Sequence, residues 1–152
     1  MAHFAELKEK TDPSGHTADT HLIVERVVVV DNRHVDSDEH VSGENWCSTF
    51  FGGGNWKQTS YNAKFRKKYA GIGDRYDSSK NKFIGQQPFA SWTLDADDDW
   101  QAPVTRPQEA DAQHEINYAI SWDEANTQWT GIKKSDSTNW NWDASGLTWV
   151  SA

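Results

Sequence analysis

The longest run of apolar positions in the chain extends from Leu22 to Val30 and includes four consecutive valines. Because branched side chains are stiff and suit a pleated surface, this run predicts a strand covered on both faces. Residues 3–7 form a shorter apolar-leaning segment, and the turn-rich stretch 11–15 lies between the two. We therefore expect residues 3–7 and 22–30 to pair as antiparallel strands joined by a long loop. A second loop is expected over the polar residues 31–42.

Residues 44–51 have the length and composition of two helical turns. Ser42 is placed to cap the N-terminus of this helix, and residues 52–54 are three glycines that supply a stop. The following residues, 56–61 and 63–72, have the pattern of two strands with a bend between them. On the predicted helix the large side chains share one face; they are Trp46, Cys47, Phe50 and Phe51.

A motif recurs through the second half of the chain. It consists of an apolar residue, an aspartate, five further residues and then an aromatic residue followed by a strand former. Three copies have this spacing, and a fourth is one residue shorter. The copies are Tyr76-Asp77 to Phe83, Trp122-Asp123 to Trp129, Trp142-Asp143 to Trp149 and the shorter Leu94-Asp95 to Trp100.

Each copy of the motif predicts a small β-hairpin. The aspartate accepts hydrogen bonds from backbone N–H groups just ahead of it and starts the turn, so that the two flanking apolar side chains pair across the strands. Isolated hairpins are marginal in water, so these must pack on one another or on a partner. We expect a string of hairpins rather than one large sheet, with Pro88, Pro103, Pro107 and residues 135–138 as spacers. The predicted fold class is mainly β with one short helix.

Charge divides the chain into two parts. Residues 1–87 carry 12 acids and 12 bases, whereas residues 88–152 carry 11 acids and 3 bases and seven of the nine tryptophans. This predicts an N-terminal β domain with a short helix, residues 1–87, followed by an acidic, Trp-rich set of hairpins, residues 88–152. The net charge of −8 opposes contact with phosphate backbones and anionic membranes, so we expect neither nucleic acid nor a membrane as a partner.

The sequence lacks the residue patterns that mark several kinds of functional site. Cys47 is alone, so an internal disulfide and a cysteine-based metal site are excluded, which suits assembly in a reduced cytoplasm. The N-terminus lacks the order of a signal peptide, and no run approaches the ~18–20 apolar residues that span a bilayer, so we expect a soluble protein. The glycines at 52–54 lack the following Lys-Ser or Lys-Thr of a phosphate loop, and no Gly-x-Ser-x-Gly elbow is present.

The acidic residues and the histidines do not form the pattern of a metal site either. Asp95, Asp97 and Asp99 match the start of a calcium loop, but Trp100 and Arg106 stand where that loop needs Gly and Glu, which favours an acidic turn. None of the six histidines has the spacing of a zinc helix. No catalytic, cofactor-binding or metal-ligating residue is therefore predicted, and the chain is expected not to be an enzyme.

Two sets of residues are candidates for binding. The first is a basic segment interleaved with aromatics; its members include Lys64, Arg66, Lys67 and Lys68. It resembles a single-strand nucleic-acid platform, but a contact with an acidic protein surface needs fewer assumptions. The second set comprises Trp122, Trp129, Trp142 and Trp149. Aromatic faces beside acids suit carbohydrate, although we favour these rings as the core of the hairpins.

Several segments together resemble a group of small virion-associated structural proteins of marine bacteriophages, chiefly those that infect cyanobacteria. The similarity covers most of residues 1–130, and its most specific part is the run from Trp56 to Gly73. Outside that run it rests on Met1 to Ala5, the valine-rich strand ending at Asn32, Cys47 with Phe51 and Gly52, Pro88 to Asp95, and the C-terminal Trp-Asp…Trp unit. This chain departs from the group in its longer first loop and in its extra C-terminal hairpin.

The resemblance implies a structural protein of the virion, tail-fibre-like or knob-like, with no catalytic or cofactor residues. Our first expectation is a decoration on the capsid exterior that binds the major capsid protein or another virion protein. The N-terminal sheet and the basic segment would contact the shell. The alternative is a tail-fibre or baseplate-associated protein that contacts host surface glycans. A host-takeover protein outside the particle, or an enzyme fragment, is a third hypothesis of a different class.

Overall fold

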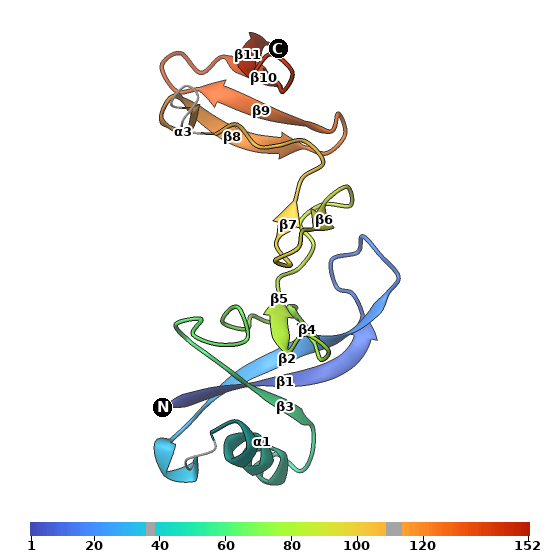
Figure 1. The fold of residues 1–152 in the computed structure, drawn as a ribbon, viewed down its shortest axis with the longest axis vertical. Helices are drawn as coiled ribbons and strands as arrows, with labels where there is room; N and C mark the ends of the chain where they lie inside the picture. The colour runs from blue at the N-terminus through green and yellow to red at the C-terminus, as the bar shows by residue number, and fades with distance from the viewer. Residues whose placement is uncertain (36–38, 109–113) are drawn as a thin grey trace. The chain divides into compact units, whose positions relative to one another are not determined.

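The computed structural model describes residues 1–35, 39–108 and 114–152 (Figure 1). The chain divides into two compact units, Met1–Gln87 and Pro88–Ala152. The boundary lies where the charge balance of the sequence changes. Each unit has buried hydrophobic residues of its own, so each is described by itself.

The N-terminal unit is built on a five-stranded antiparallel sheet with the order β3-β1-β2-β4-β5. The predicted pair is confirmed and is longer than expected, since β1 and β2 pair from Ala2↔Val30 to Thr11↔Thr20. The β4–β5 hairpin carries the first copy of the repeated motif, with Tyr76 directly opposite Phe83. The strands are β1 (Ala2–Thr11), β2 (Thr20–Val30), β3 (Asn55–Thr59), β4 (Arg75–Asp77) and β5 (Lys82–Ile84).

A β-bulge in β2 explains why Val24 and Val27, three residues apart, lie on the same face of the sheet. Glu6 pairs with Arg26 and Leu7 pairs with Val24, so Glu25 is the extra residue. An extra residue reverses the alternation of side chains beyond it. Val27 therefore packs on the same buried cluster as Val24, while the next valine along the strand packs on the opposite one.

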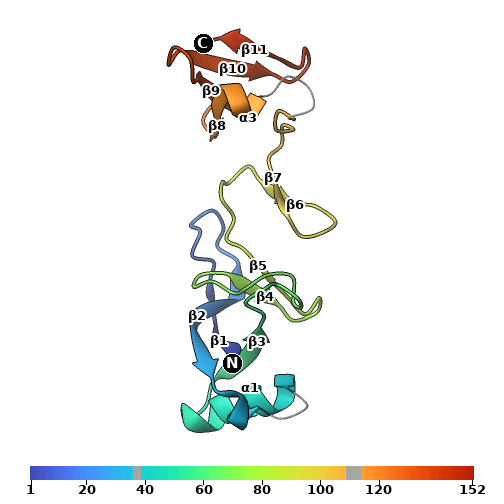
Figure 2. The same cartoon turned by 90° about the vertical axis from the view of Figure 1, so that its left-hand side faces the viewer.

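Different segments cover the two faces of this sheet (Figures 1 and 2). Helix α1 (Glu39–Phe50) packs on β3 and β1 and contributes Cys47 to a cluster with Phe4 and Trp56. On the other face, Ala70 and the β4–β5 hairpin close a cluster around Leu7 and Val24. The sheet therefore has a thin core on each side, as the valine run predicts.

The helix begins earlier than the sequence pattern indicates. Ser42 lies inside α1 and is not its N-cap. Inside the helix, Gly43 lets α1 pack closely on β1, because a Cβ there would lie 2.0 Å from Cζ of Phe4. The helix stops as predicted at the glycines, where Gly52 has φ +74°. The loop expected over 31–42 is thus partly replaced by a short 3-10 helix, η1 (Asn32–His34), and by α1, while residues 36–38 lie outside the described residues.

The strand predicted over residues 63–72 is wrong. This segment is irregular, and Ala63, Arg66 and Lys67 have positive φ. Non-local hydrogen bonds replace a strand ladder: the Ala70 N–H donates to Thr59 Oγ1 at 2.8 Å, and the Phe83 N–H donates to the carbonyl of Arg66 at 3.0 Å. Ala70 packs in a buried cluster of the sheet, whereas Ile72 is 72% exposed, so the apolar residues of this segment do not share one environment.

The C-terminal unit contains the other three predicted hairpins, each with the expected aromatic or apolar pair. Leu94 is opposite Trp100, Trp122 is opposite Trp129 and Trp142 is opposite Trp149. The fold class is confirmed: the described residues are mainly β and include one helix of more than a single turn, α1. The elements are β6 (Thr93–Leu94), β7 (Trp100–Gln101), the single-turn helix α3 (His114–Asn117), β8 (Tyr118–Asp123), β9 (Gln128–Lys133), β10 (Asn139–Asp143) and β11 (Thr148–Ser151).

The last two hairpins are not separated by a spacer. Residues 135–138 form the turn between β9 and β10, in which the Lys133 N–H donates to the carbonyl of Thr138 at 2.8 Å. Asn139 to Asn141 then pair with residues 130–132, which makes one four-stranded sheet of order β11-β10-β9-β8. Joining the hairpins edge to edge gives each of them the packing that an isolated hairpin lacks.

Candidate functional site

The aspartates of the repeated motif are committed to their turns. Asp143 Oδ1 accepts from the backbone N–H of Ser145 at 3.0 Å and of Gly146 at 3.2 Å. In its own turn, Asp77 Oδ1 accepts in the same way from the backbone N–H groups of Ser79 and Lys80. Hydrogen bonds from Ser145 and Gly146 hold the pKa of Asp143 below its ordinary value, and bonds from Asn126 do the same for Asp123. The predicted turn role is confirmed, and these carboxylates are ionised acceptors at neutral pH.

The acidic turn at Asp95 is built on the same principle. Its Oδ1 accepts from the backbone N–H of Asp97 at 2.9 Å and of Asp99 at 3.0 Å. A carboxylate that faces its own backbone in this way organises the turn. Among residues 1–35, 39–108 and 114–152, no group of three or more His, Cys, Asp or Glu side chains is arranged to hold a metal ion.

The motif tryptophans form the core of the C-terminal sheet. Trp122, Trp129 and Trp142 are 9%, 6% and 6% exposed. The ring centroids lie 5.1 Å apart for Trp122 and Trp129 and 5.3 Å apart for Trp142 and Trp149. Trp149 is half-buried and stacks on Tyr118 with 4.6 Å between centroids. Three of the four predicted binding tryptophans therefore have little ring surface left for a ligand.

Two of these indoles also fix loops through their N–H groups. Trp122 Nε1 donates to Glu124 Oε2 at 2.6 Å, and the other oxygen of that carboxylate accepts from the backbone N–H of Ser91 at 2.9 Å. Trp129 Nε1 donates to the carbonyl of Val104 at 2.8 Å. The second bond ties the segment 103–108 to the sheet across 25 residues of sequence.

Two cavities of about 450 Å³ each are lined by the segment 103–108, and Val104, Thr105, Arg106 and Gln108 line both. The first cavity is also lined by Trp92, Trp100 and Trp129, and the second by Trp142 and Leu147. From the sequence alone, the prolines at 103 and 107 predict only spacers between hairpins. The bond from Trp129 to Val104 that gives the segment a role has no local signal in the sequence.

The basic segment is not brought together as one surface. Arg66 is nearly buried and donates to Glu44 Oε1 at 2.8 Å and to the carbonyl of Gln58 at 2.8 Å. Lys68 is paired with Asp74, whose carboxylate is also buried. Lys64 is exposed and Lys67 is half-buried. Two of the four predicted basic residues thus stabilise the fold of the N-terminal unit, so the segment is not a continuous nucleic-acid platform.

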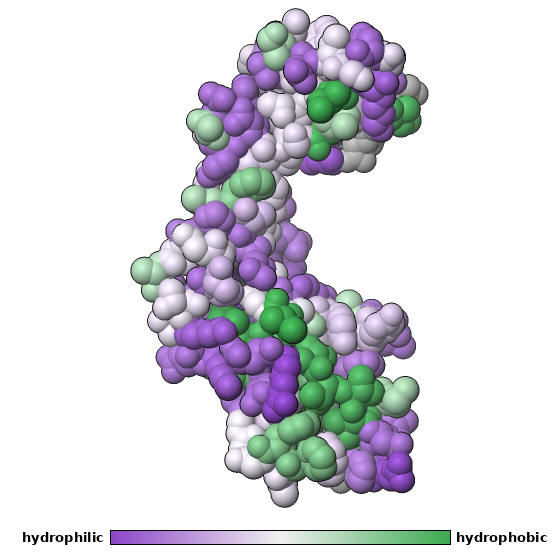
Figure 3. Space-filling model, turned by 180° about the vertical axis from the view of Figure 1, so that it is seen from behind, coloured by the Kyte–Doolittle hydropathy of each residue, from purple (hydrophilic) through white to green (hydrophobic). Residues whose placement is uncertain are grey.

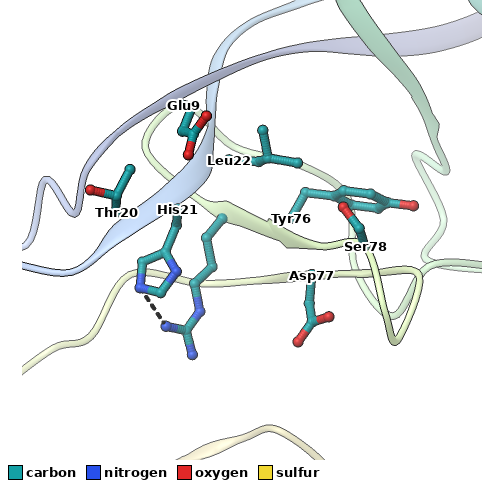
Figure 4. Close-up of a pocket in the computed structure, with 8 residues that line it drawn as sticks. Glu9, Thr20, His21, Leu22, Tyr76, Asp77 and Ser78 are labelled. Atoms are coloured by element: carbon teal, nitrogen blue, oxygen red, sulfur yellow. Dashed lines mark hydrogen bonds between the residues drawn. The ribbon is translucent and has the colours of Figure 1, made fainter.

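A polar hollow of about 540 Å³ lies between β2 and the β4–β5 hairpin (Figure 4). His21 points into it from β2, and its Nε2 accepts from Arg75 Nη1, 3.1 Å away. Burial alone would raise the pKa of the nearby Asp12, but hydrogen bonds from Ser14 and the charge of Arg75 hold it below its ordinary value. Arg75 thus links β4 to His21 on β2, which gives this histidine a structural role.

Apolar side chains are exposed on the N-terminal unit. Figure 3 shows hydrophobic residues gathered over part of it, and the exposed ones include Val29, Phe50, Tyr61 and Ile72. Val29 lies at an incomplete edge of the sheet. Strand β4 pairs with β2 only at Leu22 and Ile23, and the backbone of Val24 bonds to residues 73 and 74. Beyond that point, within the described part of the chain, residues 27–30 have a partner strand only in β1.

The structure thus defines a two-unit, mainly antiparallel β protein whose candidate sites are an open strand edge and two cavities lined by tryptophan. Comparison of the chain with protein-family models, with curated proteins and with solved structures finds no match. In the part of the chain that the structure describes, no helix has both the length and the apolar character to cross a membrane.

Proposed function

We propose that this protein is a non-enzymatic structural component of a bacteriophage particle, attached to the capsid exterior as a knob-like decoration. Its N-terminal unit binds the major capsid protein or another virion protein, and its C-terminal unit makes the outward contacts. The proposal rests on the sequence resemblance described above and on one feature of the structure, the open edge of β2.

The open edge is suited to strand addition. Among the described residues, residues 27–30 have no partner strand on the side away from β1, and the Val29 residue is 53% exposed, whereas Val30 is buried. An unpaired edge of this kind binds an extended segment of another chain, in which main-chain hydrogen bonds give affinity and alternate side chains give specificity. An extended arm of a shell protein is the partner that this edge fits.

The division into two units supports the same role. The N-terminal unit is balanced in charge, whereas residues 88–152 carry the whole net charge of −8. Exposed apolar side chains occur on both units, among them Val29 and Phe50 on the first and Leu147 and Val150 on the second. Net charge keeps a surface that faces solvent soluble, which suits the outward position proposed for the C-terminal unit.

Mass spectrometry of purified, digested particles tests the proposal. We expect peptides of this chain in the hundreds of copies per particle. A handful of copies would instead favour the alternative, a tail-fibre or baseplate-associated protein. The cavities lined by tryptophan in the C-terminal unit are the observation that favours that alternative, because host surface glycans are the ligands that it predicts. Absence from the particle would contradict both.

A pair of variants tests the attachment surface. Val29→Lys places a charge on the open edge, and Ile72→Lys places the same charge at a position of the same unit that is 72% exposed and outside this edge. We expect Val29→Lys to abolish binding to particles that lack the protein and Ile72→Lys to retain it, with both variants folded by circular dichroism. Wild-type binding by Val29→Lys would show that strand addition is the wrong mode.

A further inference from the structure

We infer that a polar cavity at one end of the N-terminal sheet is a binding site for an acidic peptide segment, which it holds by a carboxylate. The cavity has a volume of about 320 Å³. It is lined by the first residues of β1, by Asn32 just beyond β2, and by residues 58–62, 64 and 65 at the end of β3 and in the turn that follows. None of the open-edge residues 27–30 lines it, so the inference goes beyond the strand addition proposed above.

The charge of the walls favours an anion. Among the described residues, no aspartate or glutamate lines this cavity, although the chain has 23 acidic residues. Lys64 lines it and supplies a positive charge. Residues 1–87 as a whole carry 12 acids and 12 bases, so the surrounding unit does not repel an anion in the way that the acidic C-terminal unit does.

Lys64 differs from Arg66 and Lys68 because its charge is not used within the chain. Arg66 and Lys68 are each paired with an acid of the same unit. Lys64 is exposed, and in the part of the chain that the structure describes its ammonium group has neither an ion pair nor a hydrogen bond. Its backbone is nevertheless fixed, since the Lys64 N–H donates to Ser60 Oγ at 2.9 Å. An available charge therefore extends from an ordered turn.

Two asparagine side chains supply hydrogen-bonding groups at the same cavity. Asn32 and Asn62 both line it and are exposed. Within the described ranges of the chain, neither of these amide groups has a hydrogen bond. An amide group has both donors and an acceptor, so it can bond to a carboxylate and also to the N–H and C=O groups of a peptide backbone. The site therefore suits a carboxylate that is carried by a peptide.

Tyr61 gives the cavity an aromatic wall that is held in place. Its ring is stacked on His3 with 5.7 Å between centroids, and the ring of Tyr69 meets it at a steep angle with 5.4 Å between centroids. These contacts leave Tyr61 69% exposed. A fixed aromatic side chain offers contact area to a peptide at a low cost in conformational entropy.

A phosphate group fits this cavity less well than a carboxylate. A phosphate monoester carries nearly two negative charges and is typically held by a cluster of basic side chains. Of the described residues that line the cavity, Lys64 is the only lysine or arginine. Its single charge matches the single charge of a carboxylate.

NMR titration of the full-length protein with acetylated and amidated pentapeptides tests the site. One peptide alternates serine with glutamate, and the other has glutamine in place of each glutamate. We expect the glutamate peptide to bind in the millimolar range, to shift the backbone signals of residues 61–64, and to bind several-fold more tightly than the glutamine peptide. The glutamine peptide with a free C-terminus distinguishes a terminal carboxylate from a side-chain one, and binding through either supports the site.

Lys64→Gln removes the charge of the site, and Lys8→Gln is its matched control. Lys8 is also an exposed lysine of the N-terminal unit, but it does not line this cavity. We expect Lys64→Gln to weaken binding of the glutamate peptide about fivefold, which corresponds to the loss of a well-formed exposed ion pair. Lys64→Arg should retain the binding, and Lys8→Gln should leave it unchanged, with all three variants folded by circular dichroism.

Four results would each overturn the inference. They are equal weakening by Lys64→Gln and Lys8→Gln, equal binding of the glutamate peptide and the amidated glutamine peptide, tighter binding of inorganic phosphate than of the glutamate peptide, and no binding of any peptide with a carboxylate. These results depend neither on particle mass spectrometry nor on the Val29→Lys variant. A protein that is found in the virion and binds no acidic peptide therefore contradicts only this site.

Discussion

In the N-terminal unit the buried side chains come from segments far apart in the sequence, whereas in the C-terminal unit the central contacts are local. Phe4, Cys47 and Trp56 meet in one cluster although they come from three different elements, β1, α1 and β3. Trp122 and Trp129 pair across a single turn. The first arrangement forms only when the whole unit folds, and the second is already encoded in one hairpin.

The two units also differ in what their polar groups do. In the N-terminal unit Glu44 joins helix, sheet and loop, since it accepts from the backbone N–H of Gln58 at 2.8 Å and from Arg66 at 2.8 Å. In the C-terminal unit Asp123 and Asp143 bond only to their own turns. Loss of Glu44 should therefore affect several segments of the first unit, whereas loss of a motif aspartate should stay local in the second, where the long-range polar contacts come from Glu124 and Trp129 instead.

The largest effect is expected from Phe4→Ala. Phe4 is 0% exposed, and the large-to-small change should lower the free energy of unfolding of the N-terminal unit by about 3–5 kcal/mol. Urea denaturation followed by NMR signals from Val24 and from the Trp129 indole distinguishes the units. We expect only the Val24 transition to move. The control Phe50→Ala, at a side chain that is 66% exposed, should move neither. A common shift of both transitions would mean that the units unfold together.

The second-largest effect is expected from alkaline pH, which should lower the free energy of unfolding of the N-terminal unit. Burial raises the pKa of the Cys47 thiol from 9.0 to about 11, and burial also raises the pKa of Tyr76. The folded unit keeps the thiol proton to a higher pH than the unfolded chain does. The stability that this contributes is therefore fully present below pH 9.0 and is lost as the pH rises towards about 11, by about 1.4 kcal/mol per unit of difference.

The measurement is the urea midpoint of each unit between neutral pH and pH 11. The Val24 transition should fall more steeply than that of Trp129. Cys47→Ala removes the thiol, so this variant should start less stable but lose less with rising pH. An unchanged slope in the variant would assign the alkaline loss to other groups.

A smaller effect is expected from Trp129→Phe. The change keeps most of the ring but removes the hydrogen bond to the Val104 carbonyl, and the net loss should be about 1 kcal/mol. The amides of residues 104–106 should exchange faster while the pairing of β8 with β9 is retained. Trp140→Phe is the matched control, because its N–H bonds to Thr138 Oγ1 at an exposed site. If the amides of this segment exchange equally fast in the two variants, the Trp129 N–H does not anchor the segment.

The difference between the units also decides how much of the fold the sequence predicts. The four hairpin pairs could be predicted, Trp142 with Trp149 among them, because an aspartate turn and its flanking residues lie within one short window. The path of residues 63–72 could not, because Arg66 and Lys67 adopt positive φ without being glycine. The close packing of α1 on β1 also depends on a distant side chain, since a Cβ at Gly43 would meet the ring of Phe4.

The candidate sites were less predictable than the fold. The tryptophans were found by their spacing, but their burial left most of them without a free face. The segment 103–108 became a candidate only through the bond from Trp129, and the open edge of β2 only through the short length of β4. Both features depend on what lies beside a segment in space, which periodicity does not report.

The smallest effect is expected from Asp143→Ala, and it completes the contrast between the units. The variant loses the bonds from the Ser145 and Gly146 backbone N–H groups and from Ser145 Oγ. Because Trp142 still faces Trp149 across the strands, the thermal midpoint should fall only slightly, while the amides of residues 145 and 146 exchange faster. Asp143→Asn keeps an acceptor oxygen and should restore most of their protection. If Asp143→Ala instead unfolds the whole four-stranded sheet, the turns are not local units, and the C-terminal unit depends on long-range contacts as much as the N-terminal one does.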